Sequence, residues 1–216
     1  TLTPVSTTRV LTLAGGKKAG YVMLKDFIPQ AETPLANAFA SFRAAGATEL
    51  IIDLRYNGGG RISTSNALAS LVSGFAHSGK VFATLTYNPP QQALNKDFTL
   101  TAKPGPVFQR VVVITGARTC SASELVVNGL KPYATVVTIG DASCGKPFGF
   151  NPADSCGNTF SAVNFETVNG AGAGRYYDGL AATCPVDETF SGALGDPTET
   201  LTAAAVSYLA TDACPA

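Results

Sequence analysis

Apolar residues recur along this chain with two different periods, which predict alternating helices and strands. Four of them share the i, i+3, i+4, i+7 spacing of one helix face: Leu35, Ala38, Phe39 and Phe42. Thr33 as N-cap, Pro34 at the first helical position and Gly46 past the end bound this helix. Further helices are predicted over about 63–75, 121–131 and 199–210.

Short apolar runs between the helices predict strands at residues 9–14, 19–27, 49–54, 81–86, 111–115 and 134–139. The alternation of strand and helix indicates an α/β architecture. After Gly140 the pattern changes to β segments at 148–150, 159–168 and 175–177, which predict a β-rich decoration near 148–180. Residues 87–106 contain several prolines and are predicted to be a long loop. No linker divides the chain, so 1–216 is predicted to be a single domain.

The composition excludes several classes of protein. Hydrophobic residues make up 45% of the chain, and 15 basic residues balance 15 acidic ones. This is neither the polar, highly charged composition of a disordered chain nor the basic excess of a nucleic-acid binder. No apolar run is long enough to span a membrane.

The cysteines and the single histidine give no metal signature. Cysteines at 120, 144, 156, 184 and 214 match no zinc spacing, and His77 is the only histidine. We therefore expect no metal and no cofactor. A chain poor in charge and rich in Ser, Thr and Gly, with its cysteines toward the C-terminal half, favours an extracytoplasmic location. Because the sequence begins at Thr1 without a signal peptide, we expect a processed or excised form.

The first candidate site is the run Asn57–Gly60, which follows a buried strand at the end where α/β sheets bind ligands. Its glycines allow a substrate to approach closely and can present N–H groups to a developing negative charge. The alternative is a plain glycine turn. Asp53 and Arg55 flank the run, and we expect Arg55 to anchor it through an ion pair.

The second candidate site is Thr119–Glu124, where a strand turns into a helix. Ser121 would place its hydroxyl at the helix N-terminus, and the N–H of Ala122 could donate to an oxyanion. The alternative is structural, because Ser121-x-x-Glu124 is also a capping box.

A nucleophilic serine needs a base, and the sequence offers a lysine rather than a histidine. His77 lies between a helix and a strand and is a poor candidate. Lys146 lies in the glycine-rich, apolar segment Ser143–Phe150, after the strand expected to pair beside the one preceding Ser121. Both residues would then lie at the same end of the sheet, as in Ser–Lys variants of the catalytic triad. The alternative is a surface lysine on a turn.

Three segments together resemble one family, the C-terminal processing (tail-specific) serine peptidases. Ile52–Gly60 resembles the family signature Asp-Leu-Arg-x-Asn-x-Gly-Gly, and Thr119–Leu125 resembles its nucleophile segment, Ser-Ala-Ser-Glu. Ser143–Lys146 resembles its Thr-x-Gly-Lys segment. The three occur in the family's order, and the similarity covers roughly residue 19 to the C-terminus.

The resemblance implies an α/β fold, the crotonase/ClpP-like spiral of ββα units, and a serine peptidase acting on polypeptides without a cofactor. It implies Ser121 as nucleophile and Lys146 as general base. The N–H groups of Ala122 and Gly59 would form the oxyanion hole. Supporting roles would fall to Gly58, Gly60 and Glu124.

The sequence departs from the family in two ways. The family's glutamine four residues after the lysine is Phe150 here, and the 216 residues do not include the family's peptide-binding PDZ domain, so we expect either a core cut from a longer protein or a PDZ-free branch. Some relatives on this fold bind ligands without proteolysis, so a non-catalytic binding module is the alternative. Acyl-thioester chemistry, as on the related crotonase fold, would need an acid beside the glycine run, and only Glu124 is placed near it.

For the cysteines we predict the disulfides Cys144–Cys156 and Cys184–Cys214, leaving Cys120 free and buried behind the nucleophile. The bond from Cys144 would hold the Lys146 loop rigid. Five reduced, buried cysteines are the alternative.

Overall fold

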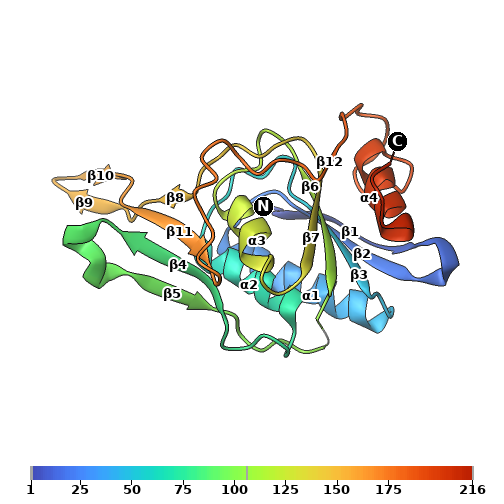
Figure 1. Ribbon diagram of the computed structural model, residues 1–216, viewed down its shortest axis with the longest axis horizontal. Helices are drawn as coiled ribbons and strands as arrows, with labels where there is room; N and C mark the ends of the chain where they lie inside the picture. The colour runs from blue at the N-terminus through green and yellow to red at the C-terminus, as the bar shows by residue number, and fades with distance from the viewer. Residues whose placement is uncertain (1, 106, 216) are drawn as a thin grey trace.

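A six-stranded sheet forms the centre of the molecule in the computed structural model, which describes residues 2–105 and 107–215 (Figure 1). The strand order is β1-β2-β3-β6-β7-β12. The strands are β1 Val5–Thr12, β2 Lys18–Leu24, β3 Glu49–Asp53, β6 Arg110–Thr115, β7 Thr135–Gly140 and β12 Cys184–Pro185. All neighbouring pairs are parallel except β1 with β2. Strands β3, β6 and β7, which lead into the three motif segments, therefore have their C-terminal ends at the same end of the sheet.

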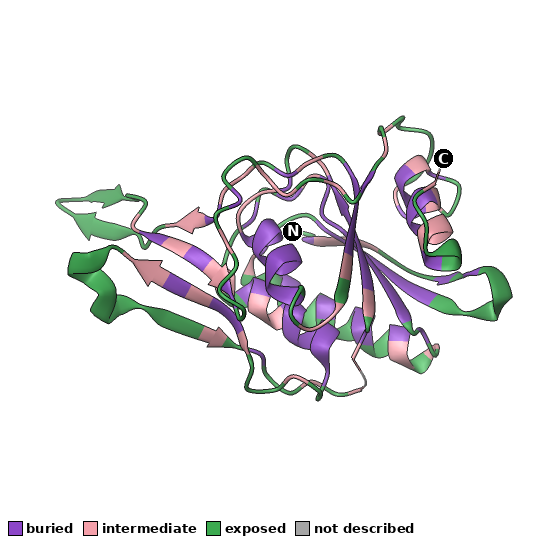
Figure 2. Ribbon diagram, viewed as in Figure 1, coloured by how far each residue is buried: buried purple, intermediate pink, exposed green. Residues whose placement is uncertain are grey.

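Helices cover both faces of this sheet (Figure 1). They are α1 Glu32–Ala44, α2 Ile62–Ser73, α3 Ala122–Leu130 and α4 Thr200–Thr211. Residues of α1, α2 and α3 pack with one set of strand side chains, and residues of α4 pack with the opposite set. Because β3 and β6 contribute to both cores, these strands are buried on both faces, as Figure 2 shows. No helix among the described residues is long and apolar enough to cross a membrane.

A second sheet of order β5-β4-β11-β8 extends away from the first as an arm (Figure 1). Its strands are β4 Val81–Tyr87, β5 Lys96–Thr99, β8 Phe148–Gly149 and β11 Phe165–Asn169. Strands β9 Ala153–Ser155 and β10 Asn158–Phe160 form an exposed hairpin at its tip (Figure 2). Short 3-10 turns lie at Ala14–Gly16, Pro29–Ala31 and Pro89–Leu94.

The α/β architecture and most of its elements are confirmed, including the pairing of β6 with β7. The four predicted face residues of α1 are all buried. Thr33 as N-cap is wrong, because the 3-10 turn Pro29–Ala31 leads directly into the helix at Glu32.

Three predictions in the β-rich parts are also wrong. The expected loop over 87–106 contains a 3-10 turn and β5, which pairs with β4; Pro106 lies outside the described residues. Segment 159–168 is divided between β10 and β11. Segment 175–177 is no strand, because Arg175 has a φ of 61° and leaves the extended conformation.

Candidate active site

Ser121 joins the end of β6 to α3 in an unusual backbone conformation. Its φ is 56° and its ψ is −114°, whereas an ordinary N-cap residue is extended with a negative φ. A non-glycine residue at positive φ persists only where its surroundings enforce it, and such residues cluster at active sites. The hydroxyl of Thr119 donates to the carbonyl of Leu54 at 2.8 Å, and the Ser123 hydroxyl donates to that of Asn57 at 2.9 Å. These bonds fix the turn against the loop after β3.

The glycine run lies directly against Ser121. A Cβ atom added to Gly59 would lie 2.8 Å from the Cβ of Ser121 and 3.1 Å from the nitrogen of Ala122. Only glycine fits this approach, and the φ of Gly59, 109°, also favours glycine. The N–H of Gly59 donates to the Oδ1 of Asn57 at 2.9 Å, which departs from the expectation that it is free for an oxyanion. Among the hydrogen bonds of the described residues, none uses the N–H of Gly58, Gly60 or Ala122.

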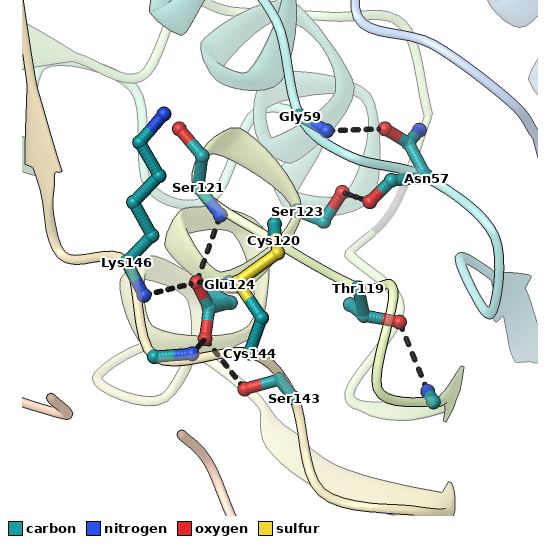
Figure 3. Close-up of a disulfide and its surroundings, with 12 residues drawn as sticks. Asn57, Gly59, Thr119, Cys120, Ser121, Ser123, Glu124, Ser143, Cys144 and Lys146 are labelled. Carbon is teal, nitrogen blue, oxygen red and sulfur yellow. Dashed lines mark hydrogen bonds between the residues drawn. A yellow bond between two sulfur atoms is a disulfide. The ribbon is translucent and has the colours of Figure 1, made fainter. Parts of the chain in front are cut away.

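The carboxylate of Glu124 ties the serine turn to the lysine segment (Figure 3). It is fully buried and accepts four hydrogen bonds. Oε2 accepts from the N–H groups of Ser121 and Lys146, both at 2.8 Å. Oε1 accepts from the hydroxyl of Ser143 at 2.6 Å and the N–H of Gly145 at 2.7 Å. A buried charge is tolerated when its lone pairs are satisfied in this way, so Glu124 is a connector and offers no free acid for acyl-thioester chemistry.

Lys146 reaches the same region as Ser121. In Figure 3 its amine and the Ser121 hydroxyl both point away from Glu124, to the same side of the view. The lysine is half-buried, and its Nζ lies 5.6 Å from the centroid of the Phe150 ring. Phe150 thus contacts the amine from the position where the family has its glutamine. The structure brings the serine and lysine segments together, whereas His77 packs against Tyr133 between α2 and β4.

The disulfide pattern corrects the prediction for this region. Cys120 is bonded to Cys144, with their Cα atoms 5.3 Å apart, so Cys144–Cys156 is wrong and Cys120 is not free. The reason is the parallel pairing of β6 with β7, which brings the segments after both strands together; the N–H of Cys144 donates to the carbonyl of Thr119 at 3.0 Å. Cys156 is exposed and free on the β9–β10 turn. The predicted pair Cys184–Cys214 is present.

Arg55 anchors the start of the glycine run, as expected. Its buried guanidinium forms ion pairs with Asp53 at 2.9 Å, Glu199 at 2.8 Å and Glu188 at 2.9 Å. Burial alone would raise the pKa of Glu199, but the hydrogen bonds from Arg55 and Thr202 outweigh it and lower that pKa to about 2. The two glutamates escaped the sequence analysis because they lie more than a hundred residues after Arg55, with no local motif.

The sheet, the glycine loop and the serine turn define an α/β fold of the ClpP/crotonase class. The chain belongs to peptidase family S41, whose model matches residues 18–165.

Several known proteins are similar to this chain. A carboxyl-terminal-processing protease of Picosynechococcus is 25% identical over 155 residues, which cover 70% of this chain and 36% of that protein. The chloroplastic carboxyl-terminal-processing peptidase 1 of Arabidopsis thaliana is 28% identical over 144 residues, 67% of this chain and 28% of that protein. The chain thus spans about a third of the length of these relatives.

Solved structures share the fold. A Bacteroides fragilis protein assigned to the S41 proteases superimposes with a TM-score of 0.87 and 26% identity, covering 95% of this chain and 57% of that one. The photosystem II D1 C-terminal processing protease has a TM-score of 0.68 and 22% identity, covering 87% of this chain and 49% of that one.

Proposed function

We propose that this chain is the catalytic core of a serine endopeptidase that hydrolyses polypeptides through Ser121 and Lys146. The observation that carries the proposal is the backbone of Ser121, at a φ of 56° where a serine that only caps a helix is extended. Glu124 binds the backbone of Ser121 and of Lys146 with the same carboxylate oxygen. Membership of a peptidase family supports this reading.

In the proposed reaction, neutral Lys146 accepts the proton of the Ser121 hydroxyl as the serine oxygen attacks an amide carbonyl. The lysine then gives this proton to the leaving amine, and water, activated by the same lysine, releases the acyl group from Ser121. The oxyanion would accept hydrogen bonds from the N–H of Ala122 and from a second N–H of the Gly58–Gly60 run. Since the N–H of Gly59 is bonded to Asn57, the neighbouring glycines are the better placed donors in this run.

The test is hydrolysis of an unstructured polypeptide by the wild type, Ser121→Ala and Lys146→Ala, from about pH 6 to about pH 10. We expect each substitution to lower kcat by at least about 10³-fold, as for other catalytic groups that act as a unit. Wild-type activity should rise with pH, because only neutral lysine accepts a proton. Lys131→Ala, at an exposed lysine one residue past α3, is the matched control. Full activity of Lys146→Ala would show that another group is the base.

A non-catalytic peptide-binding module is the second candidate, and Phe150 is the observation that favours it. Among the contacts of the described residues, the Lys146 amine meets only the Phe150 ring, where the family has a polar partner. If the chain only binds, the wild type will not cleave, and Lys146→Ala will keep its affinity for the peptide.

We also propose that residues 1–216 form one catalytic domain that works outside the cytoplasm. Two disulfides support an oxidising compartment, because such bonds are rare in the cytosol. Thiol titration of the denatured protein, isolated without reductant, should find one free thiol, that of Cys156. Five free thiols would overturn this assignment.

A further inference from the structure

The segments that carry the proposed nucleophile and base are joined by a covalent bond. Cys120 immediately precedes Ser121, and Cys144 lies two positions before Lys146. The disulfide between them therefore joins the two segments at their backbones, beside Glu124 and away from the Ser121 hydroxyl and the Lys146 amine (Figure 3).

The position of the Lys146 amine depends on this junction. Among the described residues, the Lys146 amine contacts the Phe150 ring. The lysine segment is therefore anchored through its backbone rather than through the amine. That backbone is held by the hydrogen bonds of Gly145 and Lys146 to Glu124, by the bond from Cys144 to Thr119, and by the disulfide. Because a shift of about 1 Å in a reacting group can cost about 10²-fold in rate, loosening this backbone should reduce catalysis.

Cys144 is an exposed residue and Cys120 a half-buried one, so we expect the thiolate of a reagent to attack the disulfide from the Cys144 side. The Cys144 sulfur lies 3.8 Å from Oε2 of Glu124. After reduction a free thiol would lie beside the carboxylate oxygen that holds the N–H groups of Ser121 and Lys146, where it would compete for that oxygen.

We propose that Cys120 and Cys144 are positioning residues whose disulfide holds the Lys146 segment against Ser121, and that reduction of this bond lowers the activity of the folded protein. The inference rests on the proposed peptidase function. In the redox step, a thiolate of an external dithiol attacks the Cys144 sulfur and Cys120 leaves as a thiolate. The second thiol of the reagent then displaces Cys144 and closes the reagent's own disulfide. Two electrons pass to the protein, and the reagent's two protons end on the two cysteine thiols.

The experiment compares wild type with the double variants Cys120→Ser/Cys144→Ser and Cys184→Ser/Cys214→Ser, each with and without dithiothreitol. The two bridges close loops of 24 and 30 residues, so their loss should lower stability by similar amounts. The second bridge ties β12 to the segment after α4, which makes it a matched control. We expect the first variant to lose about 10–100-fold in kcat with little change in KM, and the control to keep its kcat. Equal losses of kcat in the two variants would contradict a positioning role.

Hydrogen exchange of the backbone N–H groups in residues 143–149 gives a readout that needs no activity. Reduction of the wild type should speed exchange of Gly145 and Lys146, whose N–H groups are bonded to Glu124. If exchange speeds up but no protein cleaves, the positioning role stands and the peptidase proposal fails. If exchange and kcat are both unchanged by reduction, the positioning role is wrong.

Discussion

At the scale of single residues, the candidate site depends on a strained serine that its neighbours hold in place. A residue in a sparsely populated φ/ψ region costs about 1–3 kcal/mol, and Ser121 is at a φ of 56°. The carboxylate of Glu124 and the hydroxyl of Thr119 offset this cost by fixing the turn on either side. The sequence predicted Ser121 and Lys146 from motifs, and the capping box predicted the bond from the Ser121 N–H to Glu124. It did not predict the bonds that Glu124 accepts from Ser143, Gly145 and Lys146, because these residues lie about twenty positions further along the chain and two of the donors are backbone N–H groups.

The glycine run allows a sharp test of the close approach to Ser121. In Gly59→Ala the new methyl group would lie 2.8 Å from the Cβ of Ser121, at a φ of 109° that alanine avoids. We expect kcat to fall by about 10²-fold or more, because the methyl group would push Ser121 and the N–H of Ala122 out of position, and a shift of about 1 Å can cost this much in rate. A Cβ at Gly58 meets nothing within 4 Å, so Gly58→Ala is the matched control. The measurement is the initial rate at which each variant hydrolyses the same polypeptide. Equal rates for the two variants would show that Gly59 is not part of the site.

At the scale of secondary-structure elements, the sequence predicted the helices and strands whose buried side chains recur with a regular period. Helix α1 and strand β6 were found because their buried faces leave a regular apolar pattern. Strands β9 and β10 were missed as a hairpin because all their residues are exposed and carry no such pattern. Strand β12 has only two residues, too few for any period. Elements held by backbone pairing alone cannot be read from side-chain hydrophobicity.

The ion pairs of Arg55 connect the loop after β3 with the start of α4, and they predict a pH dependence of stability. The pKa of Glu199 is lowered to about 2 from an ordinary value of 4.5. Its contribution to the free energy of unfolding is therefore complete above about pH 5 and is lost as the pH falls through 4.5 toward 2. At neutral pH, Glu199→Gln should lower the free energy of unfolding by roughly 1–3 kcal/mol. The loss stays within this range because Arg55 keeps Asp53 and Glu188 as partners.

Urea unfolding of wild type and Glu199→Gln at a series of pH values measures this difference. The gap between them should narrow as the pH falls below about 4.5. Asp187→Asn, at an exposed acid one position before Glu188, is the control and should change stability little at any pH. A gap that stays constant down to about pH 2 would show that Glu199 does not act through its charge.

At the scale of the whole molecule, two disulfides join segments that lie 24 and 30 residues apart in the chain. One disulfide fastens the serine turn to the lysine segment, and the other fastens β12 to the segment after α4. The sequence could not settle this pattern, since the pairing of Cys120 follows from the alignment of β6 with β7 rather than from spacing along the chain. Because Cys144 is bonded to Cys120, the unpaired cysteine is Cys156, which lies on the arm.

The free thiol of Cys156 predicts how the protein behaves under oxidation. Cys156 is exposed on the turn of the β9–β10 hairpin, at the tip of the arm, where a second molecule can approach it (Figure 2). An unpaired cysteine in an oxidising compartment tends to pair between chains. Air oxidation should therefore yield a disulfide-linked dimer, seen on a non-reducing gel and absent in Cys156→Ser. The segments proposed to be catalytic carry neither the Cys156 thiol nor the hairpin, so kcat should be the same for the dimer and for Cys156→Ser. A covalent dimer that persists in Cys156→Ser would mean that one of the two assigned disulfides exchanges between chains.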